Sequence, residues 1–579
     1  MNNDFKHRLI LTSCVGIFFL CGCSSSQKTI EEKQPDRSIS PQDRAGRAID
    51  HDRALQHFIE GAALDAKGSY AEAALEYQEA LQADPNAAIY YAISKDYLLL
   101  GKINRAADAA GEAVRLDPQN ISYRENLANI YFNASRVDLA VREYEQIVAI
   151  DSNYTAGWFA LARLYQPSQP QKAVIVFEKM LAQDETQFDV LFQCAQTYIS
   201  LGRFDDAAAK YKQMLELDPS NKPLQKQLAE TYAKGGRLDQ SRAILETMVE
   251  ADSSDAEVVA TLADVYLDQK EYQSAIHLYE NLLSRGIKNT EIRLRIGVGF
   301  FGLTERDSTL IPKTLALFEE LRNELPNDWR PYWYLGALAA NQRKDSLAAQ
   351  YFEQVTKREE RHGDAWWFYG SSLFSMGNYS KLLEVMGQAQ KLLPKDFRFY
   401  LLQGLALTRL GKQEEAVQPL EKAYAINPKD INTLSTLALT LDGLHRYETS
   451  DSIYEDGLKL DPKNPLLLNN YGYSLAERGL QLERALEMSK QAITAEPENS
   501  SYLDTYGWIF FKLGKYEEAA LYIEKSVATG SASSVVHEHL GDIYQQLGRK
   551  DKALELWKKA LEMDPQNQAV KEKIARGAN

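Results

Sequence analysis

Two short patterns contain the residue types that bind phosphates or metal ions. Residues 297–302 read Gly-Val-Gly-Phe-Phe-Gly, with the spacing of a dinucleotide-binding loop, but such a loop must follow a strand and open a helix. Gly297 and Phe300 instead occupy the small and aromatic positions of a repeated pattern, so we attribute these glycines to that pattern. His537 and His539 lie about 200° apart around one predicted helix, without a cysteine or third histidine nearby. We therefore expect one solvated residue and one groove residue rather than metal ligands.

The sequence contains no other recognised catalytic constellation. It has no Gly-x-Ser-x-Gly nucleophile motif, no Walker phosphate loop and no His-Glu-x-x-His zinc motif. Cys194 stands one residue before the small Ala195 on a face predicted to pack inward, which is typical of a buried core residue. The net charge of −15 argues against a nucleic-acid surface, since phosphate binding needs clustered Lys and Arg. We predict that the chain is not an enzyme and uses neither cofactor nor metal.

The dominant feature of the chain is a repeat punctuated by proline. Pro394, Pro428 and Pro462 are each separated by 34 residues, and most other proline intervals approximate multiples of that period. Small and aromatic residues recur at fixed places within it, and in the last repeat these are Gly541, Tyr544, Ala553, Trp557, Ala560 and Pro565. Small residues let two antiparallel helices approach, and aromatic residues on the same face fill the remaining gaps. The pattern therefore predicts helical hairpins, which must stack to bury their apolar faces.

This pattern resembles the tetratricopeptide repeat, whose signature is W-x2-L-G-x2-Y, A-x3-F and P. The resemblance extends over about residues 54 to 567. It implies an all-α fold, an α-solenoid in which about fifteen helical hairpins form a right-handed superhelix.

The N-terminus carries a second pattern. Twelve largely apolar residues at positions 9–20 follow two basic residues; they are too few to span a bilayer, which needs about 20, and they fit a secretory signal. Residues 20–23 read Leu-Cys-Gly-Cys and resemble the bacterial lipoprotein box, although Cys21 stands where Ala or Ser is usual. The resemblance implies that Cys23 is acylated and becomes the mature N-terminus, and Ser24 after it favours the outer membrane. An ordinary cleaved signal peptide is the alternative.

The rest of the chain divides by composition and period. Residues 24 to about 50 are polar without periodicity and predict a flexible tether that spans roughly 30 Å. Extra residues near Asp307–Ile311 interrupt the eighth repeat, and they either bend the superhelix or are neutral. The predicted order begins with a lipoprotein signal peptide (1–22) and a lipidated Cys with tether (23–53). An N-terminal repeat arm (54–287), an irregular repeat with insertion (288–328), a C-terminal repeat arm (329–567) and a capping helix (568–579) follow.

In the family that the repeat resembles, positions 2, 5, 9, 12 and 13 of each first helix line a concave groove. Aromatic residues and asparagines at those positions here are Trp333, Trp367, Phe374, Tyr473, Trp508, Phe511, Asn126 and Asn129. Exposed aromatic residues anchor peptides or sugars, whereas the alternative for each is packing against the adjacent repeat. The asparagines either hold the backbone of an extended ligand or are solvated.

These resemblances imply a membrane-anchored scaffold or adaptor that binds proteins or peptides of the bacterial cell envelope in its groove. The lipid on Cys23 would hold it in the membrane, with the outer membrane facing the periplasm as the expected location. The alternative is a periplasmic scaffold for polysaccharide export whose groove binds glycan.

Overall fold

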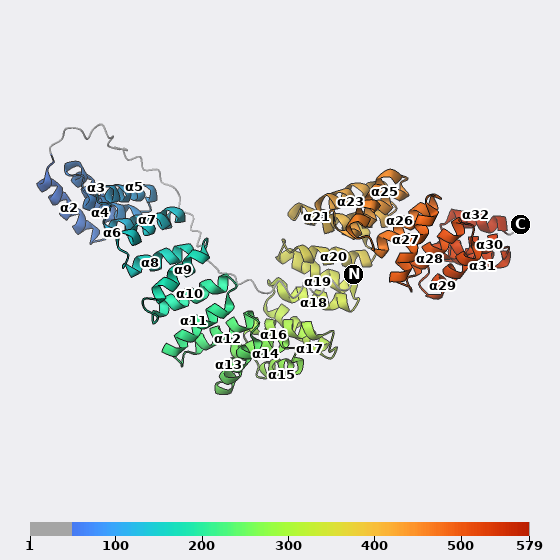
Figure 1. Cartoon of the computed structure of the whole chain (residues 1–579), viewed down its shortest axis with the longest axis horizontal. Coiled ribbons are helices and arrows are strands. Elements are labelled where there is room, and N and C mark those ends of the chain that lie inside the picture. Colours follow the sequence, from blue (N-terminus) through green and yellow to red (C-terminus); the bar gives the residue numbers. More distant parts are fainter. Residues whose placement is uncertain (1–48, 578–579) are drawn as a thin grey trace. The chain divides into compact units, whose positions relative to one another are not determined.

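The computed structural model describes residues 49–577 of the chain. These residues form 31 helices and no strand (Figure 1). They divide into two compact units, which meet in the chain between Gly302 and Leu303. We call the part before this boundary unit 1 and the part after it unit 2, and each is described by itself.

Unit 1 consists of helices that alternate as the first and second members of hairpins. They are α2 (His51–Asp65), α3 (Tyr70–Ala83), α4 (Ala87–Leu99), α5 (Ile103–Leu116), α6 (Ile121–Asn133), α7 (Val137–Ile150), α8 (Thr155–Tyr165), α9 (Pro170–Leu181), α10 (Phe188–Ser200), α11 (Phe204–Leu217), α12 (Lys222–Lys234), α13 (Leu238–Ala251), α14 (Ala256–Asp268), α15 (Tyr272–Ser284) and α16 (Thr290–Leu303), which ends at the boundary.

Unit 2 continues the same alternation. Its helices are α17 (Leu310–Glu324), α18 (Trp329–Asn341), α19 (Asp345–Arg358), α20 (Gly363–Ser375), α21 (Tyr379–Leu392), α22 (Phe397–Arg409), α23 (Gln413–Ile426), α24 (Ile431–Gly443), α25 (Tyr447–Leu460), α26 (Pro465–Glu477), α27 (Leu482–Ala495), α28 (Ser500–Lys512), α29 (Tyr516–Ala528), α30 (Ser534–Gln546), α31 (Lys550–Met563) and α32 (Gln568–Gly577).

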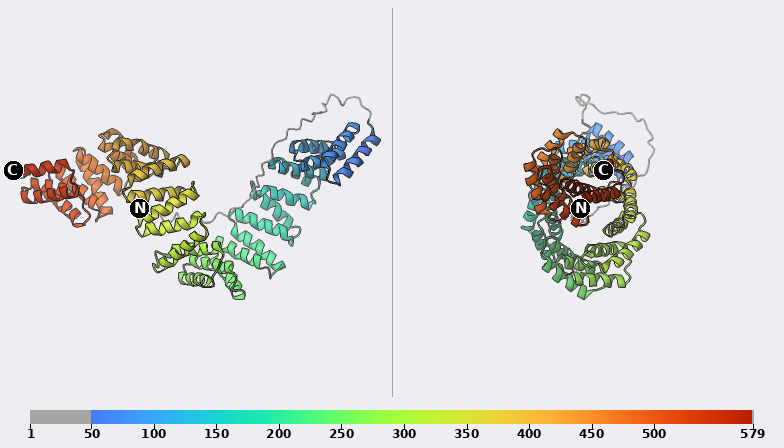
Figure 2. Two further views of the ribbon diagram at one scale, coloured as in Figure 1. Left: turned by 180° about the vertical axis from the view of Figure 1, so that it is seen from behind. Right: turned by 90° about the vertical axis from the view of Figure 1, so that its right-hand side faces the viewer.

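Within each unit the hairpins stack in chain order. The first helix of a hairpin contacts its second helix, as α28 contacts α29, and the second helix contacts the next first helix, as α29 contacts α30. Figure 2 shows these stacked pairs from two further directions. The predicted fold class, an all-helical α-solenoid of about fifteen hairpins, is confirmed.

The helix ends follow from local sequence. Pro465 is the first residue of α26, where its missing N–H costs nothing, and the side chain of Asn464 before it accepts a hydrogen bond from the backbone of Leu467. The turn from α28 to α29 passes through Gly514, whose φ of 73° is a left-handed conformation that glycine adopts without strain. The proline of the 34-residue period, Pro462, stands just before the start of α26, directly after Asp461, which caps the end of α25.

Small residues mark the places where two helices touch. A Cβ atom on Gly541 would lie 2.5 Å from the ring of Trp557, and Ala553 beside this contact is fully buried. Cys194 is fully buried in the core of unit 1, which confirms the expectation of a core residue. The glycine pattern at 297–302 lies inside α16, so the strand that a dinucleotide-binding loop requires does not precede it within the described residues.

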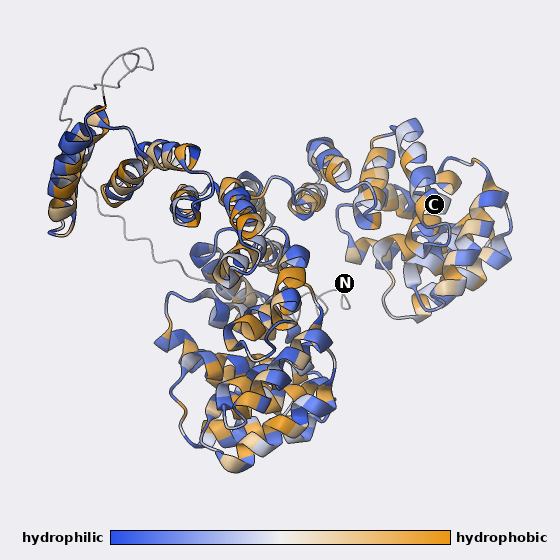
Figure 3. Cartoon of the chain, turned by 60° about the vertical axis from the view of Figure 1, so that its left-hand side comes forward, coloured by the Kyte–Doolittle hydropathy of each residue, from blue (hydrophilic) through white to orange (hydrophobic). Residues whose placement is uncertain are grey.

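Hydrophobic and hydrophilic residues alternate along the helices (Figure 3). Among residues 49–577, no helix is both long and apolar enough to cross a membrane.

Six residues, 304–309, connect α16 to α17, whereas three, 342–344, connect α18 to α19. The predicted domain boundaries stay predictions.

Candidate functional site

The first helices of successive hairpins form one continuous face in unit 2. Helix α24 contacts α26, α26 contacts α28, and α28 contacts α30, in addition to the contacts within each hairpin. We call the surface that these first helices share the first-helix face. It is the counterpart in the structure of the predicted groove, so the predicted groove residues are placed relative to it below.

Trp508 is the centre of an aromatic cluster on this face. Its ring stacks on His539 of α30, with centroids 3.8 Å apart and planes 13° apart. On its own helix it stacks on Phe511 at 4.6 Å and 9°. The indole N–H donates to Glu477 of α26 at 2.5 Å. Only 6% of Trp508 is exposed, so it supports the face from beneath rather than offering an open ring.

His539 joins the cluster through a carboxylate as well as through stacking. Its Nδ1 lies 3.0 Å from an oxygen of Asp504 on α28, and both side chains are buried. His537 is also buried, with its Nδ1 2.9 Å from the carbonyl oxygen of Ser533. The expectation that one of the two histidines is solvated is therefore wrong, because α30 is covered by α28, α29 and α31.

Tyr473 of α26 is half-buried beside this cluster, with its ring 6.3 Å from that of His539. Burial raises the pKa of its hydroxyl strongly, and the negative charges of Glu477, Asp504, Glu538 and Asp442 raise it further. The carboxylates near Tyr473 thus add to burial in keeping its hydroxyl protonated.

Two lysines neutralise part of this charge. Lys512 lies 3.1 Å from Glu477, and Lys573 of α32 lies 2.7 Å from Glu538 and 2.5 Å from Asp542. Burial opposes ionisation of Glu477, but hydrogen bonds from Trp508 and Lys512 leave its pKa below the ordinary value. The carboxylate is therefore charged at neutral pH.

The other predicted aromatic residues lie on α18 and α20, apart from the Trp508 cluster. Trp333 is 5% exposed and packs against Phe352 and His362, with ring centroids 5.4 and 4.7 Å away. Trp367 and Phe374 are half-buried on α20. Of these three, the two on α20 are partly exposed.

The predicted asparagines belong to unit 1. Asn126 is half-buried and donates to the hydroxyl of Ser94 on α4 at 2.7 Å, which links two successive first helices. Asn129 is exposed, and its carbonyl oxygen accepts from the side chain of Asn133. Asn126 thus has a structural partner, whereas the Asn129 side chain faces solvent.

A hollow of about 610 Å³ lies between α10 and α12 in unit 1, and sequence reasoning missed it. Phe188 and Phe192 line it from α10, with Gln196 and Gln227 among its other walls. Phe192 is the fifth residue of its helix, as Trp333 and Trp367 are of theirs. The positional rule that selected those tryptophans would also have selected Phe192.

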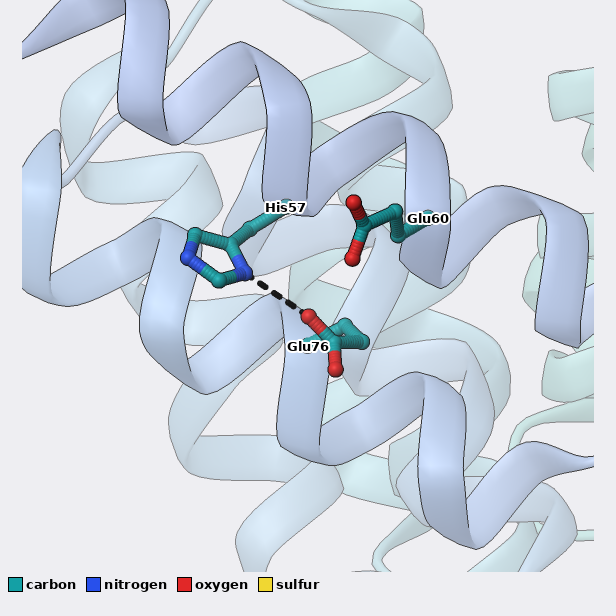
Figure 4. A group of neighbouring side chains, drawn as sticks. All are labelled: His57, Glu60 and Glu76. Carbon is teal, nitrogen blue, oxygen red and sulfur yellow. Dashed lines mark hydrogen bonds and ion pairs between the residues drawn. The ribbon is translucent and has the colours of Figure 1, made fainter.

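One group in unit 1 has side chains of the kind that bind metal ions. His57, Glu60 and Glu76 bring one ligand atom each to within 4.8 Å of one another (Figure 4). The Nδ1 of His57 is 2.7 Å from Glu76, and Gln56 donates to Glu60. These hydrogen bonds account for the arrangement without an ion.

The predicted lipidation site, Cys23, lies outside the described residues, together with the predicted signal peptide and most of the predicted tether.

Comparison with known families finds the same repeat in several places. Models described as tetratricopeptide repeat match residues 91–155, 201–265, 500–528 and 534–567. A model described as the N-terminal TPR repeats region of psidin matches residues 373–480. Together the matches cover just over half of the chain. No curated protein matches the chain significantly.

Similar solved structures include the Cut9–Hcn1 hetero-tetramer of the APC/C, at 14% identity over 85% of this chain and 96% of that chain, with a TM-score of 0.39. The structure of Naa15/Naa10 bound to HypK-THB is similar at 14% identity, over 91% of this chain and 96% of that chain, with a TM-score of 0.37. A tetratricopeptide repeat protein from Parabacteroides merdae is similar at 17% identity, over 45% of this chain and 99% of that chain, with a TM-score of 0.38.

Proposed function

The chain belongs to the tetratricopeptide repeat family, and from this premise we propose that it is a non-catalytic scaffold that binds partner proteins. The observation that supports this role best is the gathering of aromatic rings from consecutive first helices in unit 2. Tyr473 of α26, Phe511 and Trp508 of α28 and His539 of α30 meet on one face. Trp508 and His539 are buried and hold the partly exposed rings of Tyr473 and Phe511 in place, and aromatic residues held rigidly at a surface anchor protein partners with little loss of side-chain entropy.

The test is site-specific photo-crosslinking in cells. A photoreactive phenylalanine derivative replaces Phe511 on the first-helix face, and in a matched control it replaces Leu521, which is exposed on the second helix α29. We expect crosslinks to specific proteins from position 511 and none of the same products from position 521. Identical products from both positions would contradict a binding site on the first-helix face.

We further propose that Cys23 carries lipid and holds the scaffold in the bacterial cell envelope, at the outer membrane facing the periplasm. The sequence of residues 20–23 supports this proposal, since several acyl chains at about 0.8 kcal/mol per buried CH2 make attachment effectively permanent. Growth with an alkyne-bearing fatty acid should label the native chain but not Cys23→Ser. Cys23→Ser should also leave the membrane fraction, in which the native chain remains. Equal labelling of the two chains, or equal retention of both in the membrane fraction, would contradict the proposal.

A further inference from the structure

On the basis of the scaffold function proposed above, we propose that the first-helix face of α24, α26, α28 and α30 binds a partner segment that carries Lys or Arg side chains next to apolar residues. We call this surface the acidic face. Its carboxylates come from four successive hairpins, and they are Asp442, Glu477, Asp504, Glu538 and Asp542.

The acidic face has more negative than positive charge. Asp442 accepts a hydrogen bond from the hydroxyl of Ser474 at 2.5 Å, and Glu477 is the most open of the carboxylates, with 44% of its side chain exposed. Arg478 beside them pairs with Asp451 of α25 at 2.7 Å and also feels the charge of Asp442. A cation that approached this end of the face would meet carboxylates in excess.

The positive groups of this network do not balance it. Lys512 pairs with Glu477, Lys573 pairs with both Glu538 and Asp542, and His539 is hydrogen-bonded to Asp504. With Asp451 and Arg478 included, six carboxylates face three permanently charged cations. Opposite charge on a partner steers association and sets its register on the surface.

Asn469 supplies an independent indication of a ligand. It is only 5% exposed, and its side-chain carbonyl oxygen has no hydrogen-bond donor among the described residues. Its amide nitrogen donates to Asn470, which fixes the orientation of the group. Asn469 stands one turn before Tyr473 on α26, so both lie on the same side of the helix. A buried acceptor without a donor costs free energy, and because this oxygen is closed to solvent, a bound segment can donate an N–H group to it only if the surrounding side chains shift.

Apolar side chains on the same helices complete the surface. Leu439 on α24 is 49% exposed, and Val535 on α30 is also exposed. Tyr473 and Phe511 between them are half-buried. A guanidinium or ammonium group over an aromatic ring gains cation–π attraction, which a neutral or acidic partner segment lacks. This combination favours a segment in which cationic and apolar residues alternate.

The experiment measures binding of short fluorescent peptides to the purified full chain by anisotropy. The peptides share one apolar sequence and differ only in three residues, which are Arg, Gln or Glu. The test variant is Asp442→Asn/Glu477→Gln. The control variant, Glu517→Gln/Glu518→Gln, removes the same charge from exposed positions on the second helix α29. Circular dichroism confirms that each variant is folded.

We expect the Arg peptide to bind about tenfold more tightly than the Gln peptide, and the test variant to lose about tenfold in affinity, since local charge complementarity carries the preference. The control variant should bind as the native chain does, and added salt should weaken only the Arg peptide. Equal binding of the three peptides, no binding of the Arg peptide, or an equal loss in the control would overturn the proposal. Crosslinks from position 511 in cells would still support the scaffold function in that event, so the two failures are distinguishable.

Discussion

Asp96→Asn should stabilise the first hairpins of unit 1 at neutral and alkaline pH. Asp96 is completely buried in α4, and neither of its carboxylate oxygens has a hydrogen-bond partner among the described residues. Burial raises its pKa from an ordinary 3.8 to about 7, repulsion from Asp65 of α2 adds to this, and Lys95 opposes it. Burial, with Asp96 and Asp65, likewise raises the pKa of Tyr77 on α3 to about 12. The native hairpins therefore hold an acid that resists ionisation.

The size and sign of the effect follow from the pKa shift. A carboxyl whose pKa is raised on folding contributes stability that is fully present below the unfolded pKa and lost as pH rises through the folded value. At about 1.4 kcal/mol per pKa unit, the shift of Asp96 lowers the free energy of unfolding by about 1.6 kcal/mol at pH 5 and by about 4 kcal/mol at pH 8, as an upper bound. Asn has the same shape without the charge, so Asp96→Asn should recover most of this at pH 8 and little at pH 4.

Hydrogen–deuterium exchange of peptides from α2, α3 and α4 measures the opening of these hairpins directly. After correction for intrinsic exchange, the native chain should open at least about tenfold more at pH 8 than at pH 5, and Asp96→Asn should remove this difference. Asp108→Asn on the exposed side of α5 is the matched control and should behave as the native chain. The same pH dependence in Asp96→Asn and the native chain would refute the reasoning.

Further predictions concern packing and the thiol. Gly507→Ala should cost about 1–3 kcal/mol of local stability through overpacking, since the added Cβ would lie 2.5 Å from Ile523 and 3.0 Å from a backbone oxygen. At Gly387 an added Cβ meets nothing within 4 Å. Gly387→Ala should therefore stabilise its helix by about 0.5–1 kcal/mol, because alanine favours a helix more than glycine does. Exchange of the surrounding helices measures both, and equal signs would contradict the packing argument. Burial raises the pKa of the Cys194 thiol to about 12. Iodoacetamide at pH 8 should therefore alkylate this thiol in urea but not in the folded chain, and mass spectrometry measures the modification. Rapid alkylation of the folded chain would contradict this prediction and show that the site opens.

The fold was predictable because most of its contacts join residues of the same hairpin or of adjacent hairpins, which are close in the sequence. Gly541 and Trp557 contact each other within one hairpin, and the same small and aromatic spacing recurs in the other hairpins. A turn such as that at Gly514 needs only local information. Helix positions, hairpin pairing and the core placement of Cys194 therefore follow from the pattern alone.

The exposure of the predicted groove residues was not predictable in the same way. Trp508 is covered because the sixth residue of the next first helix happens to be His539, whose ring stacks on it. Trp333 is covered by His362 and Phe352. The repeat fixes where a side chain stands, but the side chain of the neighbouring hairpin decides whether water reaches it. Position rules therefore locate the first-helix face without telling which aromatic residues are open.

Asp96 shows what a comparison of repeats within the chain adds to a position rule. It is the tenth residue of α4, and the tenth residues of α10 and α12 are Thr197 and Thr231. Each of these buried hydroxyls donates to the carbonyl oxygen four residues earlier, at 2.6 and 2.7 Å. An ionised carboxylate has no proton to donate, whereas a protonated one does, so this position of the helix favours the protonated acid. Asp96→Thr should consequently remove the pH dependence as Asp96→Asn does, and a dependence that survives in Asp96→Thr would place its origin elsewhere.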